Sequence, residues 1–174
     1  MNPQMCIESL ERFPRILKSL VDGISAEEWT RKPASENWSI LEIVCHLRDE
    51  EREDFRKRLE CTLAEPIQSW PPIDPAGAAI SRNYQQQSPQ TALQEFCDER
   101  QASLRWLRSL HDVNWHRAYQ HPKIGPMPAG DLLAAWAAHD LLHVRQITKR
   151  LFESLQQTAQ PFKIDYAGSW AESH

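Results

Sequence analysis

The sequence has no run of apolar residues that approaches the roughly 18 needed for a membrane-spanning helix. It also has no Gly-rich phosphate loop, no internal repeat and no low-complexity tract. The first residues lack a basic region followed by an apolar core, so we expect no secretory signal. These absences argue against a membrane protein and against a phosphate-loop nucleotide site.

Paired cysteines are also missing. The four cysteines are scattered, without a CxxC pair, at Cys6, Cys45, Cys61 and Cys97. This pattern favours free thiols in a reducing cytoplasm over a disulfide framework. We therefore expect a cytoplasmic protein.

An excess of positive charge is the next absence. The formal net charge is -4 and the isoelectric point is about 6.0, so nothing points to nucleic acid as a partner. The 174 residues, 41% of them hydrophobic, suit one domain with a sizeable core.

Alternation of apolar and polar residues, the signal of a half-buried strand, is absent over any useful length. Apolar residues instead recur at helical spacing in four long segments. The sequence predicts helices over about residues 4–21, 39–63, 88–110 and 131–153. The fold class is therefore all-α, a four-helix bundle formed by a single domain over residues 1–174.

The connection over residues 65–84 is long and rich in proline. Its length suits a crossover between the second and third helices of the bundle. The C-terminal segment, residues 156–174, contains Phe162, Tyr166 and Trp170 and is more aromatic than a disordered tail usually is. We expect part of it to pack on the bundle.

The fourth predicted helix carries His139 and His143, which lie one above the other on the face that also presents Trp136 and Ile147. Two histidines at this spacing can bind one metal ion. The alternative is that one is a hydrogen-bonded core residue and the other a surface residue.

A third ligand is needed, because two histidines hold a metal weakly. Of the remaining histidines, His46 alone lies in the middle of a helix on an inward-leaning flank. Facing helices of a bundle approach to about 8–10 Å, close enough for side chains of both to reach one ion. His46, His139 and His143 would leave one coordination position open, as in catalytic sites.

Two motifs resemble the DinB/YfiT-like superfamily. Residues 38–51, WSILEIVCHLRDEE, resemble its pattern W-s-x-x-e-x-x-x-H-l-x-D-x-E. Residues 139–147, HDLLHVRQI, resemble its pattern H-d-x-x-H-x-x-Q-I. The likeness extends over nearly the whole chain in the right order.

The resemblance implies an up-up-down-down bundle with the long crossover between helices 2 and 3. It implies a divalent metal, zinc or nickel, on His46, His139 and His143. It also implies an enzyme acting on a small molecule, either a hydrolase or a transferase or isomerase that uses a low-molecular-weight thiol as cosubstrate. Many members are homodimers. The alternative is a non-catalytic stress-response or binding protein.

Two carboxylates near His46 are candidate catalytic residues. Asp49 and Glu51 could orient His46 or act as a general base. Asp49 is expected to face solvent, whereas Glu51 falls near the middle of the apolar stripe. Asp140 could orient a ligand or pair with Arg100.

A homodimer is also expected from the helix itself. Leu142 points away from the histidine face, with Ala135 and Ala138 along the same side and Leu141 at its shoulder. An apolar strip of this kind favours a partner surface. The alternative is that the C-terminal segment covers the strip within one chain.

Overall fold

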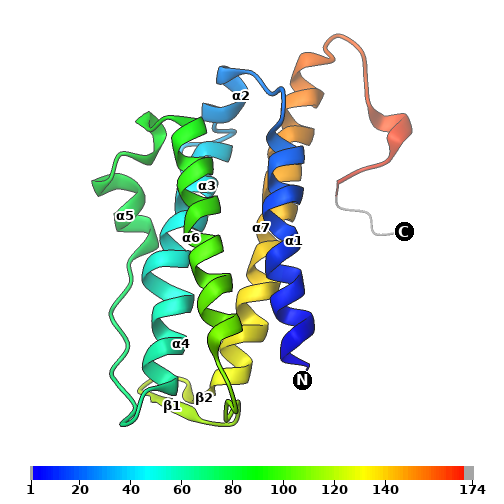
Figure 1. Ribbon diagram of the computed structural model, residues 1–174. Coiled ribbons are helices and arrows are strands. Elements are labelled where there is room, and N and C mark those ends of the chain that lie inside the picture. The colour runs from blue at the N-terminus through cyan, green and yellow to red at the C-terminus, as the bar shows by residue number, and fades with distance from the viewer. Residues whose placement is uncertain (1, 171–174) are drawn as a thin grey trace.

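Four long helical segments pack side by side in the computed structural model, which describes residues 2–170 (Figure 1). They are α1 (Pro3–Val21), the segment from α3 to α4, α6 (Pro89–Ser109) and α7 (Ala129–Thr158). Each lies within a few residues of a helix that the sequence predicts. Among the described residues, no helix is long and apolar enough to span a membrane.

The second predicted helix is divided into three parts. α3 (Ile40–Asp49) is followed without a break by a π-helical turn, η1 (Glu50–Asp54), and then by α4 (Phe55–Leu63). In the π turn the Phe55 N–H bonds to the Glu50 carbonyl, five residues back. The turn therefore contains one residue more than α-helical geometry would give it.

Shorter elements connect the long ones. α2 (Ala26–Thr30) lies between α1 and α3. α5 (Pro75–Ser81) and the 3₁₀ turn η2 (Tyr84–Gln86) lie in the crossover, and the 3₁₀ turn η3 (Asp165–Ala167) follows α7. The crossover takes the chain from the end of α4 back along the bundle to the start of α6 (Figure 1).

This crossover fixes the helix directions. α1 and α7 run one way, and α3–α4 and α6 run the other (Figure 1). The order along the chain is therefore up, down, down, up. The crossover between helices 2 and 3 is observed, whereas the expected up-up-down-down order is not.

A small antiparallel hairpin, which the sequence did not predict, precedes α7. β1 (Ala118–His121) pairs with β2 (Gly125–Pro128), with His121 opposite Gly125. Gly125 has a φ of 80°, a conformation that residues with a side chain rarely adopt. The hairpin lies at one end of the helical bundle, so the fold remains all-α in architecture (Figure 1).

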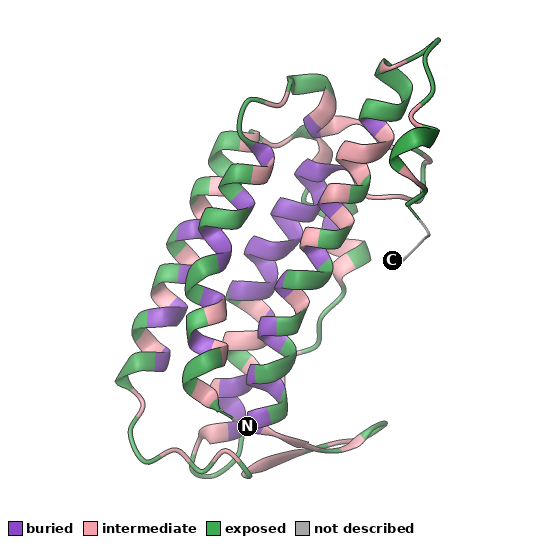
Figure 2. Ribbon diagram, turned by 90° about the vertical axis from the view of Figure 1, so that its right-hand side faces the viewer, coloured by how far each residue is buried: buried purple, intermediate pink, exposed green. Residues whose placement is uncertain are grey.

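The core consists of two apolar clusters along the bundle axis. One includes Phe13, Leu41 and Phe96, and the other includes Leu10 and Leu133. Figure 2 shows that buried residues follow the inner faces of the long helices. Several buried side chains are charged, among them Glu51, Arg100 and Asp140.

The C-terminal segment extends away from the end of α7 (Figure 1). Phe162 and Tyr166 are exposed, and the Trp170 ring lies 5.3 Å from the ring of Phe152 on α7. The expected packing of residues 171–174 lies outside the described residues. The cysteines of the chain are free thiols, as expected.

Candidate metal centre

Three histidines from two helices converge at one point of the bundle. His46 comes from α3, and His139 and His143 come from α7. One ring nitrogen of each lies within 4.8 Å of the others. The structure thus brings together the three residues that the sequence selected as metal ligands.

The local sequence explains how each histidine is placed. Ser39 begins α3 with a capping box: its hydroxyl accepts a bond from the Glu42 N–H, and the Glu42 carboxylate accepts one from the Ser39 N–H. This fixes the start of α3 and hence the direction of His46. His139 and His143 share a face of α7 because they are four residues apart.

A hydrogen bond orients the His143 ring, and a carboxyl group lies against the His46 ring. The Gln146 amide oxygen accepts a bond of 2.8 Å from His143 Nδ1, because an oxygen can only accept. This leaves His143 Nε2 with a lone pair, 3.1 Å from His139 Nε2. The Glu50 carboxylate lies 3.5 Å from His46 Nδ1, which leaves Nε2 of that ring for a ligand.

All three imidazoles are kept neutral. Burial, together with the neighbouring imidazoles, lowers the pKa of His46 and of His139 to about 3. Burial also lowers the pKa of His143, against the opposing effect of Gln146. A neutral imidazole is the form that binds a metal ion.

Aromatic rings surround the imidazoles. The Trp38 ring lies 4.8 Å from the ring of His46, and the Phe55 ring lies 5.0 Å from that of His139. These contacts restrict the rotation of the histidines. Three neutral, converging and immobilised imidazoles fit one divalent ion, and they are a donor set typical of zinc.

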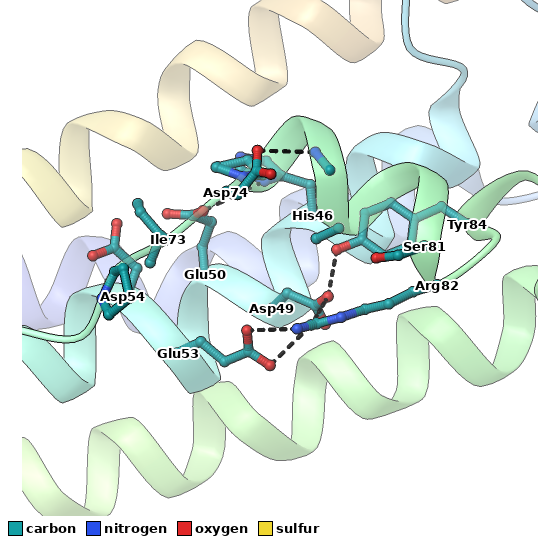
Figure 3. A pocket seen from close by; sticks show the side chains of 14 residues that line it. His46, Asp49, Glu50, Glu53, Asp54, Ile73, Asp74, Ser81, Arg82 and Tyr84 are labelled. Carbon is teal, nitrogen blue, oxygen red and sulfur yellow. Dashed lines mark hydrogen bonds and ion pairs between the residues drawn. The ribbon is translucent and has the colours of Figure 1, made fainter.

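A cavity of about 400 Å³ is lined in part by one of the three histidines, His46 (Figure 3). Its walls come from α3, η1 and the crossover with α5. His46 belongs to its lining, and most other polar groups there are carboxylates. The acidic residues that line it are Asp49, Glu50, Glu53, Asp54 and Asp74.

Asp49 is buried, so the expectation that it faces solvent is wrong. It accepts hydrogen bonds from Arg48 (2.8 Å), Arg82 (2.5 Å) and Tyr84. Arg82 and Tyr84 come from the crossover, which covers this face of α3 (Figure 3). Burial acts to raise the pKa of Asp49, but these bonds outweigh it and hold the pKa below its usual range.

Glu51 is buried, as its place on the apolar stripe predicted, but its partners lie in the core. Its carboxylate accepts bonds from Arg100 (2.8 Å), Ser103 (2.8 Å) and Trp136 (2.6 Å). Asp140 pairs with the same arginine, which was the second of the two alternatives expected for it. The catalytic roles of Asp49 and Glu51 stay predictions.

Glu50 and Gln146 touch the histidines and were not selected from the sequence. Glu50 stands in a run of charged residues, positions 48–54, and Gln146 lies within the second of the two motifs. The signal that finds them is spacing: each follows its histidine by three or four residues on the same helical face.

Comparisons with known proteins identify the family of the chain. Residues 9–147 match the family model of the DinB superfamily, and the chain belongs to that superfamily. A protein of Oceanobacillus iheyensis, whose name proposes a metal-dependent hydrolase, is 27% identical over 144 residues. That match covers 82% of this chain and 81% of the relative.

A solved structure has the same fold. It is YfiT from Bacillus subtilis, described as a probable metal-dependent hydrolase with an unusual four-helix bundle topology. The TM-score is 0.77 at 20% sequence identity, and the match covers 87% of each chain. The likeness confirms the four-helix-bundle fold.

Proposed function

We propose that this chain is a metal-dependent hydrolase of a small molecule. In this proposal His46, His139 and His143 hold one divalent ion, zinc or nickel. The observation that carries it is the convergence of three neutral imidazoles, one of which, His46, lines a cavity of about 400 Å³. The proposed activities in the names of the relatives support the same reaction class.

A divalent ion with an open position supplies Lewis acidity and lowers the pKa of the water that it binds. The chain provides the ligands and their orientation. Gln146 accepts the Nδ1 proton of His143 and so directs Nε2 inward. The Glu50 carboxyl group lies 3.5 Å from Nδ1 of His46, which leaves Nε2 of that ring for the ion.

The carboxylates at this end of the cavity have different tasks. We assign Glu50 to the orientation of His46, because it is the carboxylate that lies against that ring. Asp49 stays ionised and joins the crossover to α3 through Arg82 and Tyr84. The crossover thereby forms the outer wall of the cavity beside His46 (Figure 3).

The cavity also bears on the choice between hydrolysis and thiol transfer. Five of its lining residues are acidic and one, Arg82, is basic, and that arginine is already paired with Asp49 and Glu53. The lining thus offers an anionic cosubstrate no arginine or lysine that is free of a carboxylate. We therefore favour water over an anionic low-molecular-weight thiol as the nucleophile.

Metal analysis tests the ligand set. The protein, freed of any affinity tag and dialysed against zinc, should contain one zinc per chain. His143→Ala should lose the zinc and keep its helical circular dichroism, because one of three ligands is gone. His121→Ala is the matched control: this histidine lies on the hairpin and bonds the Lys123 and Ile124 N–H groups.

Unchanged zinc content in His143→Ala would refute the site. A panel of chromogenic esters, amides and phosphoesters then tests the reaction class. Hydrolysis should require zinc, stop with a chelator and be lost in His143→Ala but not in His121→Ala. Turnover that a chelator does not affect would refute metal-dependent hydrolysis.

A further inference from the structure

A cluster of buried charges joins the helices beside the metal centre. Arg100 on α6 is 1% exposed. Its guanidinium donates to Glu51 (2.8 Å) and, through two nitrogens, to both oxygens of Asp140 (2.7 and 2.9 Å). It also donates to the carbonyl of Leu10 on α1 (2.9 Å). One side chain thus contacts α1, η1, α6 and α7.

The cluster is attached to both helices that carry the histidines. Glu51 follows the α3 histidine within the same continuous helical segment. Asp140 is the residue after His139, and the Trp136 indole, one turn before that histidine, donates to Glu51 (2.6 Å). Ser103 donates to the other oxygen of Glu51 (2.8 Å). The Glu51 carboxylate is therefore held on both sides.

Glu51 also lies within the π turn. A π turn widens the helix by one residue and is rare without tertiary contacts that hold it. Here the turn brings Phe55 against α7, with its ring 5.0 Å from that of His139 and stacked at 5.8 Å on that of Trp136. Glu51 and Phe55 thus fix the turn to α7 from its two ends.

Stability alone is a poor explanation for such a cluster. Removing charges from water is expensive, and apolar residues of similar volume often stabilise a core as well or better. What ionic groups add is direction, because a guanidinium paired with a carboxylate through two bonds permits one geometry. Here the two-bond pair joins α6 to α7 through Asp140, and the same guanidinium holds η1 through Glu51.

We propose that Glu51, Arg100 and Asp140 are positioning residues for the metal centre. They hold the π turn against α7 and thereby set the distance of His46 from His139 and His143. This inference rests on the proposed three-histidine site. It predicts that the cluster controls metal affinity and coordination geometry although none of its members is a ligand.

Glu51→Gln tests the proposal, because it keeps the shape of the side chain and removes its charge. We expect zinc affinity to fall by about tenfold to a hundredfold, as for other groups that support metal ligands. Competition with a chromophoric chelator measures this change. The visible absorption spectrum of the cobalt(II)-loaded protein, which reports coordination geometry, should also change.

Glu99→Gln is the matched control. Glu99 on α6 pairs with Arg52 of η1 (3.0 Å) and Arg56 of α4 (2.7 Å), so it joins α6 to the same helical segment without touching α7. The Glu99→Gln variant should have a lower free energy of unfolding, with zinc affinity and the cobalt spectrum unchanged. Ser103→Ala removes one bond to Glu51 and should lower zinc affinity less than Glu51→Gln does. Ser103→Ala replaces Glu51→Gln as the test if Glu51→Gln does not fold.

The outcomes separate the two proposals. Wild-type zinc affinity and cobalt spectrum in Glu51→Gln or, if that variant does not fold, in Ser103→Ala would overturn the positioning role, whatever happens to stability. If the wild-type protein binds no zinc, the three-histidine site itself is overturned, and the positioning role with it.

Discussion

Neighbouring carboxylates on the cavity wall differ in their preferred charge state. Hydrogen bonds from Arg48 and Tyr84 outweigh burial and hold the pKa of Asp49 below its usual value of 3.8. Burial and the nearby Asp54 carboxylate raise the pKa of Glu50 above its usual range. Residues adjacent in sequence thus favour opposite protonation states, because one faces cations and the other faces a carboxylate.

Asp49→Asn should lower the free energy of unfolding by about 2 kcal/mol at pH 7, since the bonds lost are to charged groups. Because the folded pKa lies below 3.8, this contribution is present above pH 3.8 and is lost as the pH falls through the folded pKa. Urea unfolding of both proteins at pH 7 and pH 3 measures the difference.

Asp98→Asn is the control for this experiment, because Asp98 is exposed and accepts a bond from Gln94. It should change stability little at either pH. A difference between wild type and Asp49→Asn that is equal at pH 7 and pH 3 would contradict the ionised, hydrogen-bonded state of Asp49.

Sequence reasoning reached the three histidines because a helical face is a local property. His46, His139 and His143 each lie toward the apolar face of a helix, and helical periodicity alone reveals this. It placed Asp49 wrongly, because the residues that bury it come from the crossover. No local pattern states which face of α3 the crossover covers.

At the level of elements, the long helices were predictable and the π turn was not. The apolar residues Ile40, Leu47, Phe55 and Leu59 satisfy a helical period with or without one extra residue in a turn. The hairpin strands are four residues each and carry no alternation of apolar and polar side chains. The first strand contacts the crossover.

Those contacts centre on Trp70. Its ring stacks on that of Tyr119 of β1 at 4.4 Å, its indole donates to Thr62 of α4 (3.0 Å), and Arg58 lies over it at 5.0 Å. Trp70 therefore ties the crossover to the bundle and to the hairpin. The crossover residues that follow it line the cavity.

Trp70→Ala should loosen the crossover. We expect a loss of about 2 kcal/mol in the free energy of unfolding and faster amide exchange over residues 66–75, because a large packed ring is removed. Hydrogen–deuterium exchange measures this. Thr62→Val keeps the Trp70 ring and removes its hydrogen bond, together with the bond from the Thr62 hydroxyl to the Arg58 carbonyl, and should have a smaller effect. Equal exchange in Trp70→Ala and wild type would refute the anchoring role.

For the whole molecule, the main unexplained surface is an apolar strip on α7. Leu141 and Leu142 are 59% and 62% exposed, and Ala135 and Ala138 are exposed beside them. The alternative was that the C-terminal segment covers this strip. Up to residue 170 it does not, because Phe162 is exposed and Trp170 packs on Phe152. We propose that a second copy of the chain covers the strip.

Sedimentation at micromolar concentration should therefore show a homodimer rather than a species of 20.2 kDa. Leu142→Glu should shift the protein to monomer, because it would bury an unpaired charge in the interface. Zinc content should stay unchanged, since the Leu142 side chain is exposed whereas His143 is buried. Ile124→Glu, an exposed apolar position on the hairpin turn, is the control and should leave the dimer intact. A 20.2 kDa species that persists on concentration would rule the dimer out, and the strip would then need a different partner.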